Sequence, residues 1–388
     1  MLTNRINSLS ESMTIAITML AKKLKSEGKD ILSFSAGEPD FDTPECIKTA
    51  AIKAINDGFT KYTPVDGIPE LLKAISNKLK RDNNLDYAPN EIIVSNGAKH
   101  SLYNVFQALI QEGDEVIIPA PYWVTYPELT KYCGGTVVEI QTTIDQRYKI
   151  SPEQLKNAIT PKTKLLILTS PSNPTGSVYS KEELEALAEV LKGTSVWVLS
   201  DEIYEKLVYD TKFISTGAIS EDMLNRTITI NGVSKSVSMT GWRMGYMACK
   251  NIDLVKACSA LQSQSTSNIC SITQKASIPA LDGTADDDIF RMQQAFKARR
   301  DIACELLNEI EGITVVKPDG AFYLFVNIEG ITKDDMRFSQ ELLKQKGVAV
   351  VPGCGFGSEG HFRFSFATDL ESIKLGIERI AEFAREFK

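Results

Sequence analysis

Five short polar clusters follow one another along the sequence, and each comes directly after an apolar stretch with the pattern of a β-strand. They lie at residues 96–99, 121–123, 173–176, 201–204 and 234–235. Because the carboxyl ends of parallel strands share one edge of a sheet, we expect these clusters to meet in one crevice. One polar cluster would be ordinary, since loops are polar, but this succession predicts a binding site.

The clusters contain residue types suited to carbonyl chemistry. A lysine amine is a poor nucleophile at its usual pKa of about 10.4, but burial or a cationic neighbour lowers that pKa. The neutral amine of Lys235 can then condense with an aldehyde. Asp201 can keep a pyridine nitrogen protonated, so that the ring accepts electrons. Tyr204 and Asn173 can bind a phenolic oxygen on such a ring, and Trp123 can stack on its face.

A second group of residues has the types expected around a phosphate. Gly97, Ala98 and Lys99 form a turn that opens a predicted helix, where free backbone N–H groups attract anions. Arg243, eight residues after Lys235, can add a charge-assisted hydrogen bond. A cation in the first turn of a helix is slightly unfavourable, so Lys99 itself indicates that an anion offsets this cost.

Considered alone, each of these residues has an ordinary structural explanation. Lysines are almost never fully buried, so Lys235 by itself would be interpreted as a surface residue. Asp201 could cap a helix, and Asn173 stands before a proline, as turn residues often do. The aromatic residues could simply pack in the core. Only the whole set, in order along the chain, favours a site.

A glycine-rich segment at residues 355–360, GFGSEG, has the spacing GxGxxG of a dinucleotide-binding loop. Such a loop must open a helix, whereas residues 362–366 continue as a strand pattern. We therefore interpret this segment as an ordinary loop and set aside a NAD-dependent enzyme.

The elements that must position the clusters alternate between strands and helices. Strand patterns cover residues 91–95, 115–119, 136–140, 164–169, 196–200, 227–230 and 246–249. Helical patterns lie between several of them, at residues 101–111, 152–159 and 181–192, and Ser180 with Glu183 forms a capping box. This alternation predicts an α/β fold, a large domain with a mostly parallel seven-stranded sheet flanked by helices.

The last hundred residues have a different pattern. A long helix at residues 286–311 precedes a strand at 320–326, a helix at 338–346, a strand at 362–366 and a closing helix at 370–387. We expect a smaller α+β domain there. The predicted bounds are an N-terminal arm at residues 1–15, a small domain of residues 16–45 and 290–388, and a large cofactor-binding domain of residues 46–289.

Composition narrows the class of protein. The 388 residues are 43% hydrophobic and 24% charged, and their net charge is −7 with no basic stripe, which argues against nucleic acid as a partner. No apolar run reaches the roughly 18 residues that span a membrane, and the N-terminus lacks a signal pattern, so we expect a cytoplasmic protein. Seven scattered cysteines and two histidines, His100 and His361, argue against disulfides and metal.

Several longer stretches resemble the class I aminotransferases, which are fold-type I enzymes dependent on pyridoxal phosphate. They are SAGEPDFDTP (35–44), YTPVDGIPEL (62–71), PAPYWVTYP (119–127), SPSNPTG (170–176), SDEIYEKLVY (200–209) and SKSVSMTGWRMGY (234–246), followed by GAFYLF and RFSFA. The nearest resemblance is to the bacterial subgroup of aspartate aminotransferases. It covers nearly the whole chain, and several motifs in the right order make it specific.

The resemblance assigns roles to individual positions. It implies that Lys235 forms the Schiff base with pyridoxal phosphate and moves the proton, with Asp201 at the pyridinium nitrogen and Tyr204 at the phenolic oxygen. The other cofactor positions that it implies are Tyr62, Gly97, Ala98, Lys99, Trp123, Asn173, Ser234 and Arg243. Arg363 would bind the substrate α-carboxylate, and the remaining substrate positions are Gly37, Lys99, Trp123 and Asn173. A serine common three residues before the lysine is replaced by Gly232, which leaves the phosphate ligands open.

The resemblance also implies a homodimer, because Tyr62 corresponds to a tyrosine that reaches the phosphate of the partner subunit. We expect ping-pong amino transfer between amino acids and 2-oxo acids, with aspartate and 2-oxoglutarate as the favoured pair. Lys99, with Ser12 and Thr14 of the partner, would hold the second carboxylate. Prephenate, aromatic amino acids or alanine remain open as substrates, as does a pyridoxal-phosphate-dependent lyase reaction. A non-catalytic regulator would need a DNA-binding module for which the chain has no basic segment.

Overall fold

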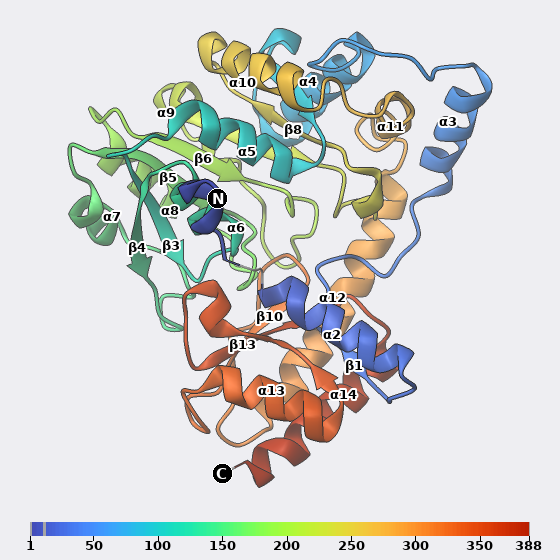
Figure 1. Cartoon of the computed structure of the whole chain (residues 1–388), viewed down its shortest axis with the longest axis vertical. Helices are drawn as coiled ribbons and strands as arrows, with labels where there is room; N and C mark the ends of the chain where they lie inside the picture. The colour runs from blue at the N-terminus through green and yellow to red at the C-terminus, as the bar shows by residue number, and fades with distance from the viewer. Residues whose placement is uncertain (1, 11–12, 388) are drawn as a thin grey trace.

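The computed structural model describes residues 2–10 and 13–387, and its large sheet contains all seven strands predicted from the sequence (Figure 1). The strands run in the spatial order β2-β8-β7-β6-β5-β3-β4. Their bounds are β2 (Ile92–Ser95), β3 (Glu115–Ala120), β4 (Thr136–Gln141), β5 (Thr163–Thr169), β6 (Trp197–Asp201), β7 (Thr227–Gly232) and β8 (Gly245–Ala248). Within this sheet, β8 alone runs opposite to the other strands, and it pairs with β2 and β7. The prediction of a mostly parallel sheet is therefore confirmed.

Both faces of this sheet are buried, as the continuous apolar strands predict. On β5, Leu165 and Ile167 pack into one core cluster, whereas Leu166 and Leu168 pack into another on the opposite face. Helices α5 (Ala98–Leu109) and α10 (Ile252–Ser265) belong to the first side, and α7 (Pro152–Ala158) and α8 (Lys181–Leu191) to the second. The sheet is thus covered by helices on both faces (Figure 1).

Local signals fix several helix starts. The capping box predicted at α8 is confirmed, because the Ser180 side chain accepts the Glu183 N–H at 3.2 Å and Glu183 accepts the Ser180 N–H at 2.7 Å. A second capping box joins Ser151 to Gln154 at the start of α7. The helix predicted at residues 101–111 begins three residues earlier, at Ala98, because Gly97 takes the non-helical position before it. That difference places Ala98 and Lys99 in the first helical turn.

A second, smaller unit follows the long helix α12 (Asp286–Asn308), which connects the upper and lower parts of the molecule in Figure 1. Its antiparallel sheet has the order β12-β13-β10-β9, with bounds β9 (Thr314–Val315), β10 (Tyr323–Asn327), β12 (Val351–Pro352) and β13 (His361–Ser365). Helices α13 (Asp335–Lys346) and α14 (Leu370–Glu386) pack beside it. The α+β character of this unit is confirmed, and the exact domain bounds stay a prediction.

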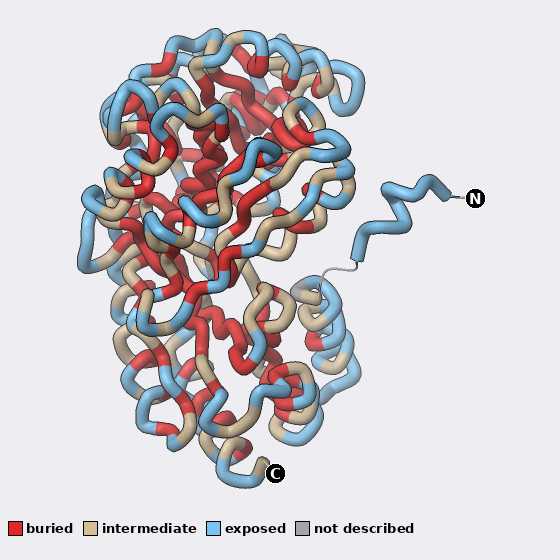
Figure 2. The backbone as a smooth tube through the Cα atoms, turned by 90° about the vertical axis from the view of Figure 1, so that its left-hand side faces the viewer, coloured by how far each residue is buried: buried red, intermediate tan, exposed pale blue. Residues whose placement is uncertain are grey.

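The N-terminal part of the chain joins this second unit. Helix α2 (Met13–Ser26) leads into β1 (Leu32–Ser33), which pairs in parallel with β11 (Val348–Ala349). The preceding segment, with α1 (Asn4–Asn7), stands out from the body of the molecule in Figure 2 and contacts α6 (Thr125–Tyr132). Helices α3 (Glu45–Asn56), α4 (Pro69–Asn83), α9 (Glu221–Arg226) and α11 (Ser271–Ser277) complete the large unit.

Two further predictions can be compared with the fold. Residues 353–356 form a short 3-10 turn that is followed by β13, so the GxGxxG segment opens no helix and is a loop, as predicted. Within the part of the chain that the structure describes, no helix combines the length and the apolar character needed to cross a bilayer.

Candidate active site

The carboxyl ends of β2, β3, β5, β6 and β7 border a pocket of about 330 Å³. Its lining residues come from both units: Gly37, Ala98, Lys99, Trp123, Tyr126, Thr169, Asn173, Asp201, Ile203, Tyr204, Ser234, Lys235, Thr240, Arg243, Tyr323 and Arg363. Of the predicted site residues whose side chains the structure describes, all except Gly97 and Tyr62 line this pocket. A pocket of this volume suits a small-molecule ligand.

Lys235 reaches into the pocket just beyond β7. Its amine donates a hydrogen bond to the backbone oxygen of Gly37, which comes from the smaller unit. Burial lowers the pKa of Lys235 to about 8, and the nearby charges of Arg363 and Arg243 act in the same direction, whereas Glu38 opposes them. At pH 7, one unit below this pKa, roughly a tenth of the amine is neutral, far more than at the usual pKa of about 10.4, and the neutral form is the one that reacts with carbonyl groups.

Asp201 ends β6, the strand between β5 and β7, and is buried. Its carboxylate accepts the hydroxyl of Tyr126 at 2.8 Å and the N–H of Ile203 at 3.3 Å. Burial raises the pKa of Asp201 to about 6, while these hydrogen bonds and the charge of Lys235 lower it. The carboxylate is thus fixed in orientation and poised to pair with a cationic group in the pocket.

Tyr204 lies next to Asp201 in the same turn, and its buried hydroxyl shares a 2.9 Å hydrogen bond with the hydroxyl of Tyr323. Burial, together with the Tyr323 hydroxyl, raises the pKa of Tyr204 well above its ordinary value. Tyr204 therefore stays protonated and able to donate one hydrogen bond.

Arg363 is buried on β13 without a carboxylate partner among the described residues. Its guanidinium donates to Asn173 Oδ1 at 2.9 Å and to the backbone oxygen of Ser35 at 2.8 Å, but its Nε has no partner. Burial lowers the pKa of Arg363. Since buried charges in proteins are normally paired, this guanidinium indicates a site for an anion.

A second anion-binding position lies at the start of α5. The helix has no side-chain cap, so the first two amides, those of Ala98 and Lys99, can face an anion, while the His100 N–H donates to the Gly97 oxygen. Arg243 lies directly against Gly97, where a Cβ would come within 2.3 Å of its Nη2, and the positive φ of Gly97, +84°, also disfavours any residue with a side chain. Lys99 is close enough for the charge of Arg243 to add to partial burial in lowering the pKa of Lys99. Two neighbouring cations at a helix N-terminus suit a phosphate.

The structure gives a physical reason for Gly232, which stands where a serine is often found. A Cβ at this position would lie 2.8 Å from the backbone oxygen of Met244 and 2.9 Å from Cα of Gly245. Gly232 pairs with Gly245 across β7 and β8, and backbone atoms lie too close to both positions for either to carry a side chain. Phosphate contacts must therefore come from other residues, among which Ser234 lines the pocket.

Sequence reasoning missed several lining residues, most clearly Tyr126 and Tyr323. Both occur within motifs that indicated the family, PAPYWVTYP and GAFYLF, but their hydroxyl partners lie far along the chain. Tyr62 is 90% exposed and does not line the pocket of its own chain. Ser12 lies outside the described residues, and the side chain of Thr14 is likewise not described.

A family profile, curated relatives and a solved structure similar to this chain are all described as aminotransferases. The profile of the family described as aminotransferase class I and II matches residues 29–380. An aspartate aminotransferase from Bacillus sp. (strain YM-2) is 50% identical, with 99% of each chain covered. A probable aspartate/prephenate aminotransferase from Rhizobium leguminosarum bv. phaseoli is 46% identical, with 98% of each covered. The structure of an aspartate aminotransferase from Thermus thermophilus with maleate superposes with a TM-score of 0.95, at 42% identity and 99% coverage of both chains.

Proposed function

Because the chain belongs to the class I and II aminotransferases, we propose that it transfers the amino group of aspartate to 2-oxoglutarate with pyridoxal phosphate as cofactor. The observation that carries this proposal is the combination, in one pocket, of a lysine amine, a buried carboxylate and a buried guanidinium without a charged partner.

The residues of the pocket fit this cofactor. The uncapped N-terminus of α5, with Lys99 and Arg243, provides a cationic cradle for a phosphate. Asp201 can face the ring nitrogen, and Tyr204 can donate to the ring oxygen. Asn173 accepts from Arg363 through Oδ1, which leaves its Nδ2 group available to donate to the same ring oxygen. When bound, pyridoxal phosphate supplies an aldehyde and a ring that accepts negative charge.

Lys235 has the properties of the residue that moves the proton. Its pKa of about 8 lets the neutral amine take up a proton from the α-carbon of an amino acid and return it one step later. The Gly37 oxygen, which accepts from the amine, holds it between the two units. Asp201, oriented by Tyr126, keeps a positive charge on the ring nitrogen and so favours the loss of that proton. We expect ping-pong kinetics, since one site serves two substrates in turn.

Arg363 supplies the position for the α-carboxylate, because two parallel hydrogen bonds from a guanidinium match a carboxylate. Its unpartnered Nε supports this role. We propose that Lys99, whose amine lies 4.7 Å from the Trp123 ring centre at the pocket rim, binds the distal carboxylate of aspartate. Trp123 then serves as a flat wall against which a cofactor ring can stack.

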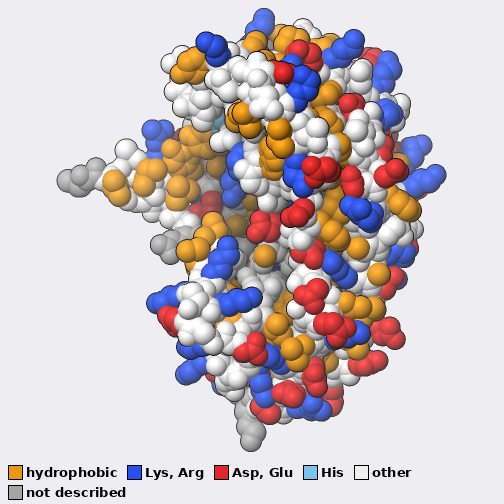
Figure 3. All heavy atoms as spheres, turned by 90° about the vertical axis from the view of Figure 1, so that its right-hand side faces the viewer, with side chains coloured by type: hydrophobic (Ala, Val, Ile, Leu, Met, Phe, Trp, Pro, Cys, Tyr) orange, Lys and Arg blue, Asp and Glu red, His pale blue; other side chains and the backbone are white. Residues whose placement is uncertain are grey.

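We further propose a homodimer in which Tyr62 completes the pocket of the partner subunit. Large apolar side chains are exposed near this segment and along α3 and α12: Ile52 is 57% exposed, Ile55 52% and Phe290 63%. Figure 3 shows hydrophobic side chains over this face of the molecule and in the projecting N-terminal segment. Exposed apolar side chains of this kind support a covered interface. Light scattering at assay concentration is the test, and an active monomer would refute the dimer.

The function is tested by reconstituting the purified protein with pyridoxal phosphate. We expect a visible absorbance band that shifts on adding aspartate, and formation of glutamate when 2-oxoglutarate is present. A screen of amino donors with 2-oxoglutarate then fixes the substrate. Product formation without any dependence on a 2-oxo acid would instead indicate a lyase.

Prephenate is the second candidate acceptor, because a relative of comparable identity carries that substrate in its name. Aspartate-dependent consumption of prephenate at a rate similar to that of 2-oxoglutarate would establish it.

A further inference from the structure

Tyr323 is a pocket residue to which neither the motifs nor the family assignment gives a role. It begins β10 in the smaller unit and is fully buried, yet it lines the pocket. Its hydroxyl lies 2.9 Å from the hydroxyl of Tyr204, which belongs to the larger unit. The hydrogen bond between Tyr323 and Tyr204 therefore connects the two units inside the pocket.

The pairing of β10 with β13 explains a second contact. Tyr323 lies opposite Ser365 and Phe325 lies opposite Arg363, so Tyr323 and Arg363 are diagonal neighbours in an antiparallel pair. Diagonal neighbours are close enough for an aromatic and a long side chain to touch. The Arg363 guanidinium lies over the Tyr323 ring, 4.4 Å from its centre. The buried guanidinium thus makes a cation–π contact with the face of this ring.

The hydroxyl contact matters because a tyrosine has only one proton to donate. If Tyr204 donated to Tyr323, its oxygen could only accept from a ligand in the pocket. If Tyr323 donates to Tyr204, the Tyr204 proton is free to point into the pocket. Burial raises the pKa of both hydroxyls, so both protons are present at neutral pH.

We propose that Tyr323 is a positioning residue: it donates its hydroxyl proton to Tyr204 and so directs the Tyr204 proton toward the ring oxygen of the cofactor. The proposal rests on the function proposed above, in which Tyr204 binds that oxygen. Chains of hydrogen bonds strengthen one another, so the donation from Tyr323 also makes Tyr204 a stronger donor. The Tyr323 ring separately fixes the position of Arg363.

The test is a pH titration of the visible band of the holoenzyme. A hydrogen bond donated to the ring oxygen favours its anionic form, so weakening that bond raises the pH at which the band changes. We expect Tyr323→Phe to raise this midpoint in the same direction as Tyr204→Phe but by less, and to lower kcat about three- to tenfold, the effect of one neutral hydrogen bond. The KM for aspartate should change less than about twofold, because the ring remains beneath Arg363. Tyr323→Leu, which also removes the ring, should raise KM in addition.

Tyr209→Phe is the matched control. Its hydroxyl donates to the backbone oxygen of Ala321, two residues before Tyr323, but Tyr209 does not line the pocket. This variant should leave the midpoint unchanged, which separates the effect of Tyr323 from the loss of any hydroxyl in this segment. The double variant Tyr204→Phe/Tyr323→Phe should shift the midpoint no further than Tyr204→Phe alone, because Tyr323 acts through Tyr204.

A wild-type midpoint in Tyr323→Phe, with a shifted midpoint in Tyr204→Phe, would overturn the proposal and leave the proposed function intact. If neither variant shifts the midpoint, then Tyr204 does not bind the ring oxygen and both proposals about it fail. An equal shift in the Tyr209→Phe control would also overturn the role of Tyr323.

Discussion

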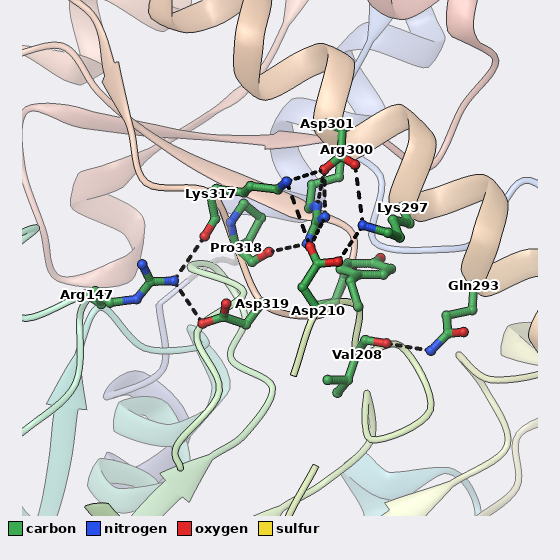
Figure 4. A network of polar contacts seen from close by, with 12 residues as sticks. Arg147, Val208, Asp210, Gln293, Lys297, Arg300, Asp301, Lys317, Pro318 and Asp319 are labelled. Atoms are coloured by element: carbon green, nitrogen blue, oxygen red, sulfur yellow. Dashed lines mark hydrogen bonds and ion pairs between the residues drawn. The ribbon is translucent and has the colours of Figure 1, made fainter. Parts of the chain in front are cut away.

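Two arginines in this molecule are buried to the same extent, at 1% exposure each, but differ in what surrounds their charge. Arg300 on α12 donates to the carboxylates of Asp210 and Asp301, the latter at 2.6 Å, and to the backbone oxygen of Pro318 at 2.9 Å (Figure 4). Arg363 on β13 donates only to an amide oxygen and a backbone oxygen, and its Nε has no partner.

The difference separates a charge that is balanced by carboxylates of the protein from one that a ligand could balance. The ion pairs around Arg300 tie α12 to the loop that carries Asp210, and Lys297 and Lys317 extend the same network. The hydrogen bonds with Lys297 and Arg300 lower the pKa of Asp210 to about 2. Arg363 has no such balance, so its desolvation is offset only when a ligand supplies a negative charge. Substitutions in the two regions should therefore affect different properties.

The largest expected effect of a substitution is at Lys235, which lies in the pocket with Arg363. Lys235→Ala removes the amine that we propose attaches the cofactor and moves the proton, so kcat should fall by several orders of magnitude. The Tm of the apoprotein should not fall, because the variant removes a buried amine whose pKa burial already lowers. Absorbance spectra, steady-state kinetics and thermal unfolding measure the three quantities. An active Lys235→Ala enzyme would refute the assignment of the pocket.

The two arginines themselves give the next effect. Arg363→Leu should raise the KM of every amino acid by roughly tenfold to a hundredfold, as the loss of about 1.5–3 kcal/mol of charged hydrogen bonding predicts, with little change in Tm. Arg300→Leu should instead lower the unfolding free energy by about 2–3 kcal/mol, less than the roughly 3–5 kcal/mol for a fully buried pair, because its carboxylate partners reach solvent. The KM of folded Arg300→Leu should stay near the wild-type value.

The opposite result would contradict this distinction between Arg300 and Arg363. If Arg363→Leu lowered Tm as much as Arg300→Leu while leaving KM unchanged, Arg363 would be a structural residue. A KM effect confined to one amino donor would place Arg363 at the side chain of the substrate rather than at the shared α-carboxylate.

The sequence predicted the large sheet well because central strands such as β5 are runs of apolar residues buried on both faces, and such a run is recognisable without knowing its partner strands. The helix starts at Ala98 and Asp335 were each placed three residues too late. Gly97 precedes the first helix without a side-chain cap, whereas Asp334 caps the second through its side chain, as aspartate often does. Such boundaries depend on backbone conformation more than on periodicity.

Features that depend on contacts far apart in the chain could not be predicted in this way. The two-residue strand β1 is specified by its partner β11, more than three hundred residues later, and the reversed direction of β8 leaves no mark on its own composition. The same holds inside the pocket. Lys235 and Asp201 were identified by motif, but Tyr126 and Tyr323 gain their importance only from hydroxyl contacts across the fold.

A smaller effect is expected at Lys99, on the solvent-facing rim of the pocket. Lys99→Ala should weaken aspartate and 2-oxoglutarate by about 1.5 kcal/mol, roughly tenfold in KM, at the low end for a charged hydrogen bond because the rim is exposed. Alanine and aromatic donors, which lack the second carboxylate, should keep their KM. Equal weakening of all donors, together with faster loss of the cofactor, would assign Lys99 to the phosphate instead.

The smallest expected effect concerns the pH dependence of cofactor capture. Only the neutral amine of Lys235 attacks an aldehyde, so the rate at which the apoenzyme forms its visible band should rise with pH, with a midpoint near the Lys235 pKa of about 8. Glu38 raises this pKa more than Asp201 does, because its carboxylate stabilises the charged ammonium. Glu38 is exposed and solvent partly screens its charge, so removing that charge should change the pKa of Lys235 by only a fraction of a unit.

Glu38→Gln tests that influence directly. Removing the carboxylate destabilises the ammonium, lowers the Lys235 pKa and should move the midpoint to lower pH, so that the variant captures pyridoxal phosphate faster than the wild type at pH 7. Stopped-flow absorbance across a pH series measures the midpoints of the wild type and of Glu38→Gln. Any pH dependence of free pyridoxal phosphate is the same for both proteins, so it cancels in the comparison. Glu38 also accepts the Thr240 hydroxyl at 3.0 Å, so Thr240→Val serves as the matched control that removes this contact but keeps the charge. A midpoint that moves equally in both variants would show that the loop contact, rather than the charge of Glu38, sets the reactivity of the lysine.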